Sequence, residues 1–284
     1  MAKTRTAQMR RRPPPHHRGT SRAPRRPVRR RRWPILPLGA VALVVLVVGG
    51  LIVASLNSGG SATAAETPAP AGVVTQATSL SSTLLSGIGT GQPITALKTV
   101  PGAPPLTIDG KPGIVFVSEE SCPFCAAERW PVVIALSHFG TWGGLGATTS
   151  SSTDVFPSTA TFSFRHATFT SPYLALQTTE LRDNAGHPLQ ALTTLDTQLI
   201  HQFDVPPFVN NADQSGAVPF LDVDNRYILA GAQYDPEVLA GLSAEQIAAQ
   251  LANPASPVAQ AVDASANILI AAIDKILYGP LSSG

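Results

Sequence analysis

The sequence predicts an α/β domain with a central mixed sheet flanked by helices, preceded by one transmembrane helix. Three observations support this prediction. A long apolar run without charges lies near the N-terminus, short β-rich runs alternate after it with segments of helical period, and the chain's two cysteines lie where such a strand meets such a helix. Of the 284 residues, residues 106–284 are expected to form one domain, because roughly 180 residues are enough to bury a core.

The apolar run is predicted to cross a membrane. No residue from Ile35 to Leu56 is charged, and about 20 such residues span a bilayer as a helix. We place the transmembrane helix at residues 33–56. A cleaved signal peptide is the alternative, because Ala62-Thr63-Ala64 has the small residues of a cleavage site. Its apolar region would, however, be only ~7–15 residues long.

Residues 1–32 are predicted to be a basic, disordered cytoplasmic tail. They hold 13 of the 20 Lys and Arg residues, so the remaining chain has 7 basic and 18 acidic residues. Basic residues beside a membrane helix favour the cytoplasmic side, which makes this a single-pass protein of the cell membrane with an extracytoplasmic C-terminal domain. The tail either attracts anionic lipid or only sets this topology. It has no interleaved aromatic residues for stacking on bases, so we expect no nucleic-acid partner.

Residues 57–105 are predicted to be a flexible tether that contains one short helix. Ser, Gly, Ala, Thr and Pro dominate its first part, a composition typical of a flexible linker. Apolar residues then recur at loosely helical spacing over residues 73–88, which predicts the helix. The folded domain is expected to begin at residue 106.

The domain opens with two strands and a long helix. Residues 106–108 and 113–117 are β-rich, and the pair Asp109-Gly110 between them is typical of a tight turn. Apolar residues then recur at helical spacing over residues 123–140. We expect this helix to kink at Pro131, because an interior proline removes one backbone hydrogen bond.

The middle of the domain is predicted to alternate between loops, strands and one helix. Gly, Ser and Thr dominate residues 141–157, which we expect to form an exposed loop. Alternation predicts a strand at residues 159–170 with a partner at 173–181. A helical insertion at about 183–214 contains apolar residues at helical spacing between positions 189 and 203.

The C-terminal part is predicted to contain a hairpin and two helices. Residues 218–223 and 227–230 are β-rich and separated by a turn. Ser243 and Gln246 form an N-terminal capping pattern for the first helix. The second helix covers about 258–277, and its acidic residues argue against another membrane crossing.

The two cysteines form the motif Cys122-Pro-Phe-Cys125 at the predicted start of a helix. A thiol at this position lies near the positive end of the helix dipole and near free backbone N–H groups, which favour the thiolate. In such motifs the pKa of the attacking cysteine falls from ~8.5 into the range ~3.5–7.5. Pro123 suits the first helical position, where its missing N–H has no partner to lose. We therefore expect Cys122 to be a nucleophile and Cys125 a resolving thiol.

The strand at 114–117, the Cys-Pro-Phe-Cys helix start and the pair Val218-Pro219 ahead of a hairpin resemble the thioredoxin-like superfamily. This resemblance implies a thioredoxin-like fold over residues 106–284. It also implies a cis peptide bond before Pro219, facing the cysteines, and a substrate-binding role for Val218 and Pro219. An extended substrate segment could pair with the backbone at Val218.

The longer motifs, Cys-Pro-Phe-Cys-Ala-Ala-Glu-Arg-Trp at 122–130 and Ala-Leu-Ser-His-Phe-Gly at 135–140, resemble domain-of-unknown-function family 929. That family also places both cysteines and Pro219 at the site. The Pro-Phe pair and Ser121 differ from thioredoxin itself and are more similar to glutaredoxins and secreted disulfide oxidoreductases. A reducing role like that of thioredoxin is therefore not implied.

The expected activity is thiol–disulfide exchange by a membrane-anchored oxidoreductase without a cofactor. Its expected partners are the membrane, cysteine-containing secreted or membrane proteins, and a membrane redox partner that recycles the site. The alternative is a non-catalytic thioredoxin-like binding or scaffold module with an inert disulfide, since extracytoplasmic cysteines are commonly structural.

Two residues that follow the cysteine motif, His138 and Arg129, are candidates for a role near the thiols. His138 follows the cysteines at a distance that imitates part of a zinc finger, but a fourth ligand is missing, so we expect no metal site. Arg129 lies one turn past Cys125 and could support a thiolate, although we expect it on the solvated surface.

Overall fold

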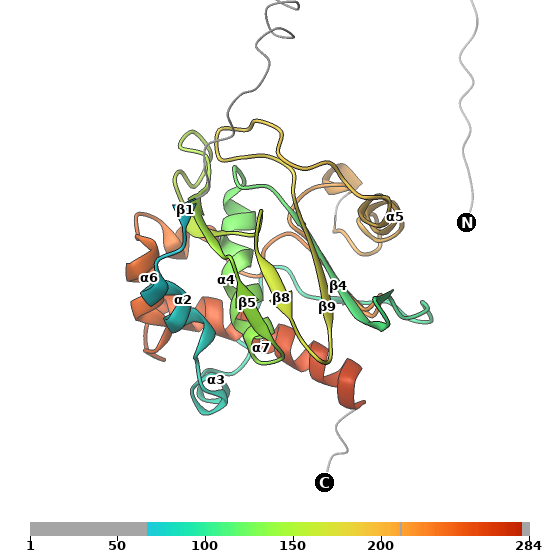
Figure 1. Cartoon of the computed structure of the whole chain (residues 1–284), viewed down its shortest axis with the longest axis horizontal. Helices are drawn as coiled ribbons and strands as arrows, with labels where there is room; N and C mark the ends of the chain where they lie inside the picture. Colours follow the sequence, from blue (N-terminus) through green and yellow to red (C-terminus); the bar gives the residue numbers. More distant parts are fainter. Residues whose placement is uncertain (1–66, 211, 280–284) are drawn as a thin grey trace, which may run out of the picture. The chain divides into compact units, whose positions relative to one another are not determined.

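The computed structural model describes residues 67–210 and 212–279 (Figure 1). The predicted cytoplasmic tail, the transmembrane helix at 33–56 and the first part of the tether lie outside these residues. Within the described part, no helix has the length and apolar character needed to cross a membrane.

A mixed sheet of six strands forms the centre of the described residues, and its middle strand is β4 (Lys111–Ser118). The neighbours of β4 are β9 (Ala175–Glu180), which is parallel to it, and β10 (Phe220–Val223), which is antiparallel. Beyond β10 lie β11 (Tyr227–Ala230) and β2 (Lys98–Thr99), whereas β3 (Thr107–Ile108) pairs with the start of β4. The protein is thus a mixed α/β structure, as its patterning predicts.

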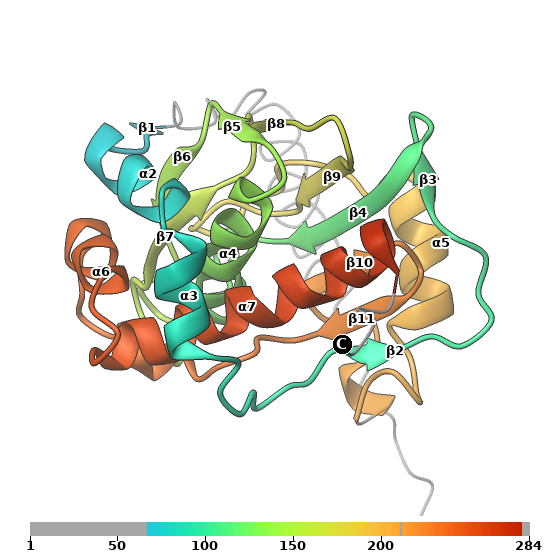
Figure 2. The same cartoon turned by 90° about the horizontal axis from the view of Figure 1, so that it is seen from below.

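Helices cover both faces of this sheet (Figure 2). The helices α4 (Pro123–Ser137) and α7 (Pro257–Tyr278) lie on one face, and α5 (Thr194–Phe203) lies on the other. Side chains alternate between the two faces along a strand, so Ile114 and Phe116 of β4 enter the core under α4 and α7. Val115 and Val117 enter a second, smaller core under α5.

The β3–β4 hairpin and the β10–β11 hairpin agree with prediction. The first turn places Asp109 and Gly110 at φ 50° and 76°, the left-handed geometry of a two-residue hairpin turn. Asp224 and Asn225 adopt φ 58° and 54° in the second turn. Both pairs are residue types that tolerate this conformation.

Two helices replace the single one predicted over residues 73–88. They are α2 (Ala71–Thr78) and α3 (Ser82–Ile88), separated because the Ser81 side chain accepts a hydrogen bond from the N–H of Leu84 (3.2 Å) and caps a new helix. The side chains of Val73 and Leu85 are buried in the main core. Asn267 of α7 donates to the carbonyl of Leu85 (2.7 Å), so these helices are fastened to the domain.

The prediction of an exposed loop at residues 141–157 was wrong for its first half. Two strands lie there, β5 (Thr141–Gly143) and β6 (Gly146–Thr149). They pair with β8 (Thr168–Thr170) and β7 (Ala160–Ser163), and β6 also pairs with β1 (Thr67–Pro68). Glycine permits this pairing, because a Cβ at Gly143 would lie 2.8 Å from the Thr168 hydroxyl. The segment therefore forms strands through distant partners, which local composition does not reveal.

The predicted strand at 159–170 is divided between β7 and β8, and its predicted partner at 173–181 pairs elsewhere. That partner is β9, which pairs with β4 in parallel. The helix predicted from residue 189 begins only at Thr194, because the side chains of Thr193 and Asp196 form a capping box there.

The remaining helices agree closely with prediction. The helix α6 (Ala244–Leu251) has a capping box formed by Ser243 and Gln246. The last helix, α7, differs from its predicted bounds by one residue at each end. Two short 3₁₀ turns, η1 (Ala212–Gln214) and η2 (Pro236–Leu239), complete the described structure.

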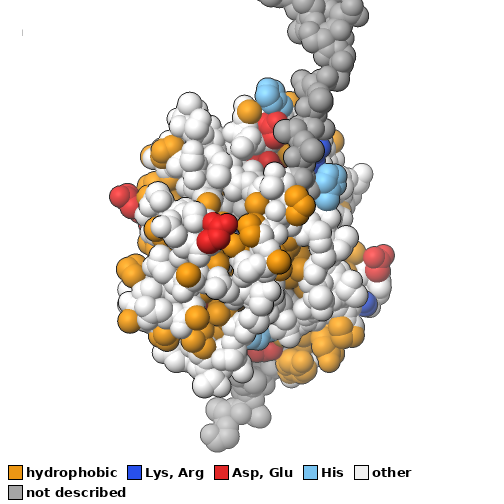
Figure 3. Space-filling model, turned by 60° about the vertical axis from the view of Figure 1, so that its left-hand side comes forward, with side chains coloured by type: hydrophobic (Ala, Val, Ile, Leu, Met, Phe, Trp, Pro, Cys, Tyr) orange, Lys and Arg blue, Asp and Glu red, His pale blue; other side chains and the backbone are white. Residues whose placement is uncertain are grey.

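Many of the acidic side chains of the domain are buried and do not contribute to its surface. Eight acidic side chains among the described residues are buried, namely those of Glu120, Glu128, Glu180, Asp196, Asp204, Asp222, Asp224 and Asp263. Figure 3 shows one face on which charged side chains of either sign are sparse. The formal balance of 7 basic and 18 acidic residues therefore overstates the negative charge that a partner would meet.

Candidate functional site

The site lies where the central strand β4 leads into helix α4. Cys122 is the N-cap residue of α4, and its Sγ accepts a hydrogen bond from the backbone N–H of Cys125 (3.2 Å). Pro123 occupies the first turn, where a missing N–H costs nothing. The predicted position of the cysteine pair at a helix start is confirmed.

The two thiols, which are free in the structure, differ in environment. Cys122 is 9 % exposed, whereas Cys125 is 0 % exposed. A hydrogen bond from the Cys125 thiol, backbone N–H groups of the helix start and the charge of Arg129 together outweigh burial and lower the pKa of Cys122. Burial, followed by the hydrogen bond and charge of Cys122, raises the pKa of Cys125 well above its ordinary value. The more accessible thiol is thus the more acidic one.

The pair Val218-Pro219 lies directly against Cys122. The peptide bond before Pro219 is cis, as the resemblance to thioredoxin-like proteins implies. The Cys122 thiol donates to the carbonyl oxygen of Val218 at 3.7 Å. Pro219 begins the approach to β10, and its carbonyl accepts from the N–H of Gly231 (2.8 Å). Residues 96 positions apart in the chain therefore meet at this thiol.

A pocket of about 290 Å³ opens beside the cysteine motif. Phe124 and Val218 form part of its lining, together with residues before β2, between α5 and β10, and at and after the end of β11. The full lining consists of uncharged residues: Ile94, Thr95, Phe124, Phe208, Val209, Asn210, Gln214, Ala217, Val218, Ala230, Gly231 and Ala232. Phe124 is 37 % exposed and contacts the ring of Phe156 edge-on at 5.9 Å between centroids.

The prediction that Arg129 lies on the solvated surface was wrong. Its side chain is fully buried on α4, where it meets Glu180 at the end of β9. Two nitrogens of the guanidinium, Nε and Nη2, donate to the two carboxylate oxygens of Glu180 at 2.9 and 2.6 Å. Ser118 connects to both residues, because its hydroxyl donates to Glu180 (2.9 Å) and accepts from Arg129 (3.3 Å). This ion pair lies beneath the cysteine motif.

The two glutamates that precede the motif have other partners. Glu120 is buried and accepts hydrogen bonds from the hydroxyls of Ser163 (2.6 Å) and Thr148 (3.2 Å). Glu119 accepts from Ser121 (3.1 Å) and lies near the partly exposed Arg182. Their negative charge is therefore directed to hydroxyl and guanidinium groups rather than to the Cys122 sulfur.

Two further acidic side chains, Glu128 on α4 and Asp263 on α7, are also buried. Burial raises the pKa of Glu128 to about 8, although the backbone and side-chain N–H groups of Gln233 donate to its carboxylate (3.0 and 2.9 Å). Burial also raises the pKa of Asp263 on α7 to about 8. Neither carboxylate oxygen of Asp263 has a hydrogen-bond partner among the described residues.

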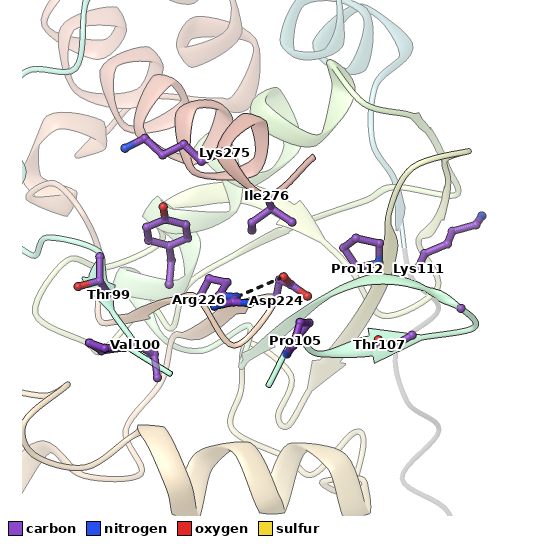
Figure 4. A pocket seen from close by; sticks show the side chains of 13 residues that line it. Thr99, Val100, Pro105, Thr107, Lys111, Pro112, Asp224, Arg226, Lys275 and Ile276 are labelled. Carbon is purple, nitrogen blue, oxygen red and sulfur yellow. Dashed lines mark ion pairs between the residues drawn. The ribbon is translucent and has the colours of Figure 1, made fainter. Parts of the chain in front are cut away.

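A larger pocket, of about 700 Å³, lies at the end of the sheet away from the cysteines (Figure 4). Lys111, Arg226 and Lys275 contribute to its lining. Arg226 lies 4.0 Å from Asp224, and the Lys111 ammonium donates to a backbone carbonyl. In Figure 4 the ammonium groups of Lys111 and Lys275 lie on opposite sides and point away from each other. The cations do not converge on one point, so we assign no anion site here.

Metal ligands do not gather in the described structure. Within residues 67–210 and 212–279, no group of three or more His, Cys, Asp and Glu side chains could hold a metal ion. His138 is the C-cap of α4, at the opposite end of the helix from the cysteines. The zinc alternative therefore has no geometric support from this histidine.

Of the residues around the thiols, Glu180 was not predicted to belong to the site. Helical spacing did suggest that Arg129 could support a thiolate, since it follows Cys125 by four residues and lies on the same face of α4, but Arg129 was expected on the solvated surface. No local pattern indicates Glu180, because its position depends on the parallel pairing of β9 with β4.

Comparison with known proteins gives one match. A sequence model of a protein family, described as Domain of unknown function (DUF929), matches residues 102–275, which is more than half of the chain. The matched range includes Cys122, Cys125, Val218 and Pro219. No curated protein and no solved structure shows significant similarity. The chain belongs to the DUF929 family.

Proposed function

We propose that this protein is a membrane-anchored, extracytoplasmic thiol–disulfide oxidoreductase in which Cys122 is the nucleophile and Cys125 the resolving thiol. The observation that carries the proposal is the asymmetry of the pair at the helix start. Cys122 accepts backbone N–H donation and has a lowered pKa, whereas Cys125 is fully buried with a raised pKa. Because the thiolate is the reactive form, this difference supports a separate role for each cysteine.

The proposed reaction has two exchange steps. The Cys122 thiolate attacks a substrate disulfide, forming a mixed disulfide and releasing one substrate thiolate, which takes a proton from water. Cys125 then loses its proton and attacks the Cys122 sulfur, which closes the Cys122–Cys125 disulfide and releases the second substrate thiolate. The substrate is reduced by two electrons and the protein is oxidised by two. The same steps in reverse oxidise a substrate dithiol.

We further propose that the fold is thioredoxin-like. The supporting features are a strand that leads into a Cys-x-x-Cys helix, a parallel neighbour on one side of that strand, and an antiparallel hairpin on the other. A cis-proline ahead of this hairpin faces the cysteines, and helices cover both faces of the sheet. These features are similar to those of the thioredoxin-like superfamily.

The proposed substrates are cysteine-containing secreted or membrane proteins. An extended segment beside Val218 and Pro219 would bring its cysteine to Cys122, because the Val218 carbonyl lies 3.7 Å from that sulfur. The uncharged pocket lined by Phe124 would accept an apolar side chain next to the substrate cysteine. A membrane redox partner would return the pair to its starting state.

One observation favours a second candidate, a binding or scaffold module with an inert cysteine pair. Both cysteines have little exposed surface, at 9 % and 0 %. A substrate would have to reach Cys122 through that small opening. The two candidates differ in whether the biological role requires the thiols.

Trapping of mixed disulfides separates the two candidates. Cys125→Ser removes the resolving thiol, so we expect Cys122 to accumulate mixed disulfides with other proteins, visible as slower bands on non-reducing gels. Cys122→Ser is the matched control and should trap nothing. If Cys125→Ser forms no adducts and the double variant Cys122→Ala/Cys125→Ala retains the biological role, the scaffold alternative holds.

The direction of electron flow follows from the reduction potential of the pair. A value near about −120 mV is that of a strong oxidant, and a value near about −270 mV is that of a reductant. Equilibration with glutathione buffers, followed by alkylation and mass measurement, gives this potential directly.

A further inference from the structure

The buried ion pair beneath the cysteines is the feature that the proposed reaction does not yet use. Arg129 lies four residues after Cys125 and seven after Cys122, so all three residues lie on one face at the start of α4. Its side chain is 0 % exposed. The guanidinium retains its charge, because arginine is not deprotonated in proteins and because Glu180 raises the pKa of Arg129 against the effect of burial. A permanent positive charge therefore lies within the protein, one helical turn below the resolving thiol.

The guanidinium is fixed in orientation but incompletely paired. Nε and Nη2 are held by the carboxylate of Glu180 at 2.9 and 2.6 Å, and the Ser118 hydroxyl accepts from Nη2 at 3.3 Å. Nη1 is buried and has no hydrogen-bond partner among the described residues. A buried donor without a partner is costly. An anion that forms nearby would therefore be stabilised.

We propose that Arg129 is a positioning residue of the redox site, whose buried charge, oriented by Glu180, stabilises the Cys125 thiolate while that thiolate resolves the mixed disulfide. This inference rests on the proposed function. Cys125 has no exposed surface, so water cannot stabilise its anion, and the Arg129 charge acts in place of water. The electrostatic effect of Arg129 favours ionisation of both cysteines, against the effect of burial.

Two negative groups oppose this effect. Glu180 on β9 neutralises part of the Arg129 charge directly, and Glu120, on the turn before α4, also interacts electrostatically with Arg129. Glu120 is itself held by Ser163 and Thr148. Removal of the Glu180 charge should therefore strengthen the effect of Arg129 on Cys125, and removal of the Arg129 charge as well should abolish that effect.

A purely structural role for the pair predicts a different result. Replacement of a buried ion pair by uncharged residues of similar size is often neutral for stability, whereas loss of one partner is destabilising. If the pair only supported packing, the rate of resolution would follow stability. Under our proposal, the rate follows the charge that remains beside Cys125.

The reaction of the reduced full-length chain with dithiobis(nitrobenzoate) measures both steps separately. Attack by Cys122 releases one thionitrobenzoate and leaves the second on Cys122 as a mixed disulfide. Attack by Cys125 on the Cys122 sulfur then closes the protein disulfide and releases the second thionitrobenzoate. The dithiol loses two electrons and two protons, and the reagent gains the two electrons. Stopped-flow absorbance therefore shows two phases, of which the second reports the Cys125 thiolate.

Three variants isolate the Arg129 charge. Glu180→Gln should accelerate the second phase at pH 7, because Arg129 is no longer neutralised. Addition of Arg129→Met to Glu180→Gln should slow that phase by at least about tenfold relative to Glu180→Gln alone, since a shift of one pKa unit changes the thiolate fraction tenfold. Arg226→Met is the control, because Arg226 is a partly exposed cation in the pocket at the end of the sheet away from the cysteines, and it should leave both phases unchanged.

Each outcome of this experiment decides a different claim. Absence of the first phase in the unaltered chain would overturn the proposed function itself. Normal first phases with equal second phases in Glu180→Gln and Glu180→Gln/Arg129→Met would overturn only the role of Arg129. If Glu180→Gln does not fold, the doubly uncharged variant is compared with the unaltered chain, and an unchanged pH profile of its second phase would equally refute the inference.

Discussion

At the scale of single residues, the two cysteines lie three positions apart, yet the pKa of one thiol is lowered and that of the other is raised, because they differ in burial and in hydrogen bonding. Cys122 stands at the N-cap, where orphan N–H groups of the helix point at its sulfur. Cys125 lies one turn inside the helix with no exposed surface. The helix start and the core boundary coincide at this motif, so an accessible, acidic thiol and a protected, basic one result from a single local structure.

Phe124 is expected to contribute to substrate binding rather than to thiol chemistry. It lies between the cysteines, lines the uncharged pocket and is 37 % exposed. Phe124→Ser should raise the KM for peptide disulfides with an apolar residue beside the cysteine by about tenfold, since a buried aromatic contact contributes more than 1 kcal/mol at a binding site. Kinetics with such a peptide and with a small disulfide such as oxidised dithiothreitol check this. Equal loss of rate with both substrates would contradict a binding role.

Asp263 is expected to make the stability of the protein depend on pH. Burial raises its folded pKa to about 8, whereas an unfolded Asp titrates near 3.9. Between these values the folded state holds a proton that the unfolded state has released, so the free energy of unfolding falls as the pH rises from about 4 to about 8. Asp263→Asn should flatten this dependence and stabilise the protein above pH 8. Urea midpoints at a series of pH values measure it.

Exposed Asp154 supplies the control for that experiment. Asp154→Asn should leave the pH profile of the urea midpoint as it is in the unaltered chain. A profile that stays equally steep in Asp263→Asn would show that other buried carboxyls, Glu128 first among them, cause the dependence.

Residue chemistry was predictable from sequence where it depended on near neighbours. The cysteine motif and its helix-start position were identified because a short pattern carries them, whereas the cis bond before Pro219 was expected only from a resemblance to known families. Arg129 was misplaced because arginines are usually exposed unless a buried acid pairs with them. That acid, Glu180, lies 51 residues away, and no pattern near Arg129 indicates it.

At the scale of elements, helix α4 depends on a partner that replaces the hydrogen bond lost at Pro131. Proline has no N–H, so the carbonyl of Ala127, four residues earlier, lacks its helical donor. The hydroxyl of Tyr234 donates to this carbonyl at 2.7 Å. The helix therefore continues through Pro131 to Ser137.

Because the Tyr234 hydroxyl takes the place of the backbone N–H that Pro131 lacks, the effects of changing these two residues should depend on each other. Tyr234→Phe leaves a buried carbonyl without a donor and should lower the free energy of unfolding by about 1–3 kcal/mol. In a Pro131→Ala background the alanine N–H can donate to Ala127, so Tyr234→Phe should cost less there. Chemical unfolding of the four variants measures the coupling between the two sites. Additive effects of the two changes would contradict the exchange of donors.

Element prediction succeeded for segments with local signals and failed for those stabilised by distant pairing. The capping box at Ser243 and the turn at Asp109-Gly110 lie within a few residues of the elements they delimit. In contrast, β5 and β6 consist of Gly, Ala, Thr and Trp and become strands only because β8 and β7 lie beside them. Composition alone therefore described this segment as a loop.

At the scale of the whole molecule, the mixed sheet was predictable but its strand order was not. Patterning indicated a buried strand before the cysteines and a hairpin near Pro219, and both lie adjacent in the sheet. The parallel neighbour β9 was predicted as a partner of a different strand. Pairing between strands separated by some 60 residues depends on the packing of helices on both faces, which local sequence does not record.

The helices α2 and α3 precede the range matched by the family, which begins at residue 102, yet they contribute to the main core. Leu85 of α3 is 2 % exposed, and its carbonyl is held by Asn267 of α7. Leu85→Ala should therefore lower the free energy of unfolding by about 2–5 kcal/mol, as expected for a buried leucine. Leu192→Ala is the matched control, because Leu192 is 40 % exposed, and it should change the free energy by no more than about 0.5 kcal/mol. Urea unfolding of the three proteins measures both values. Equal stabilities would mean that α3 rests on the domain without stabilising it, whereas the expected loss would make residues 67–101 an integral part of the folded unit that carries the cysteine site.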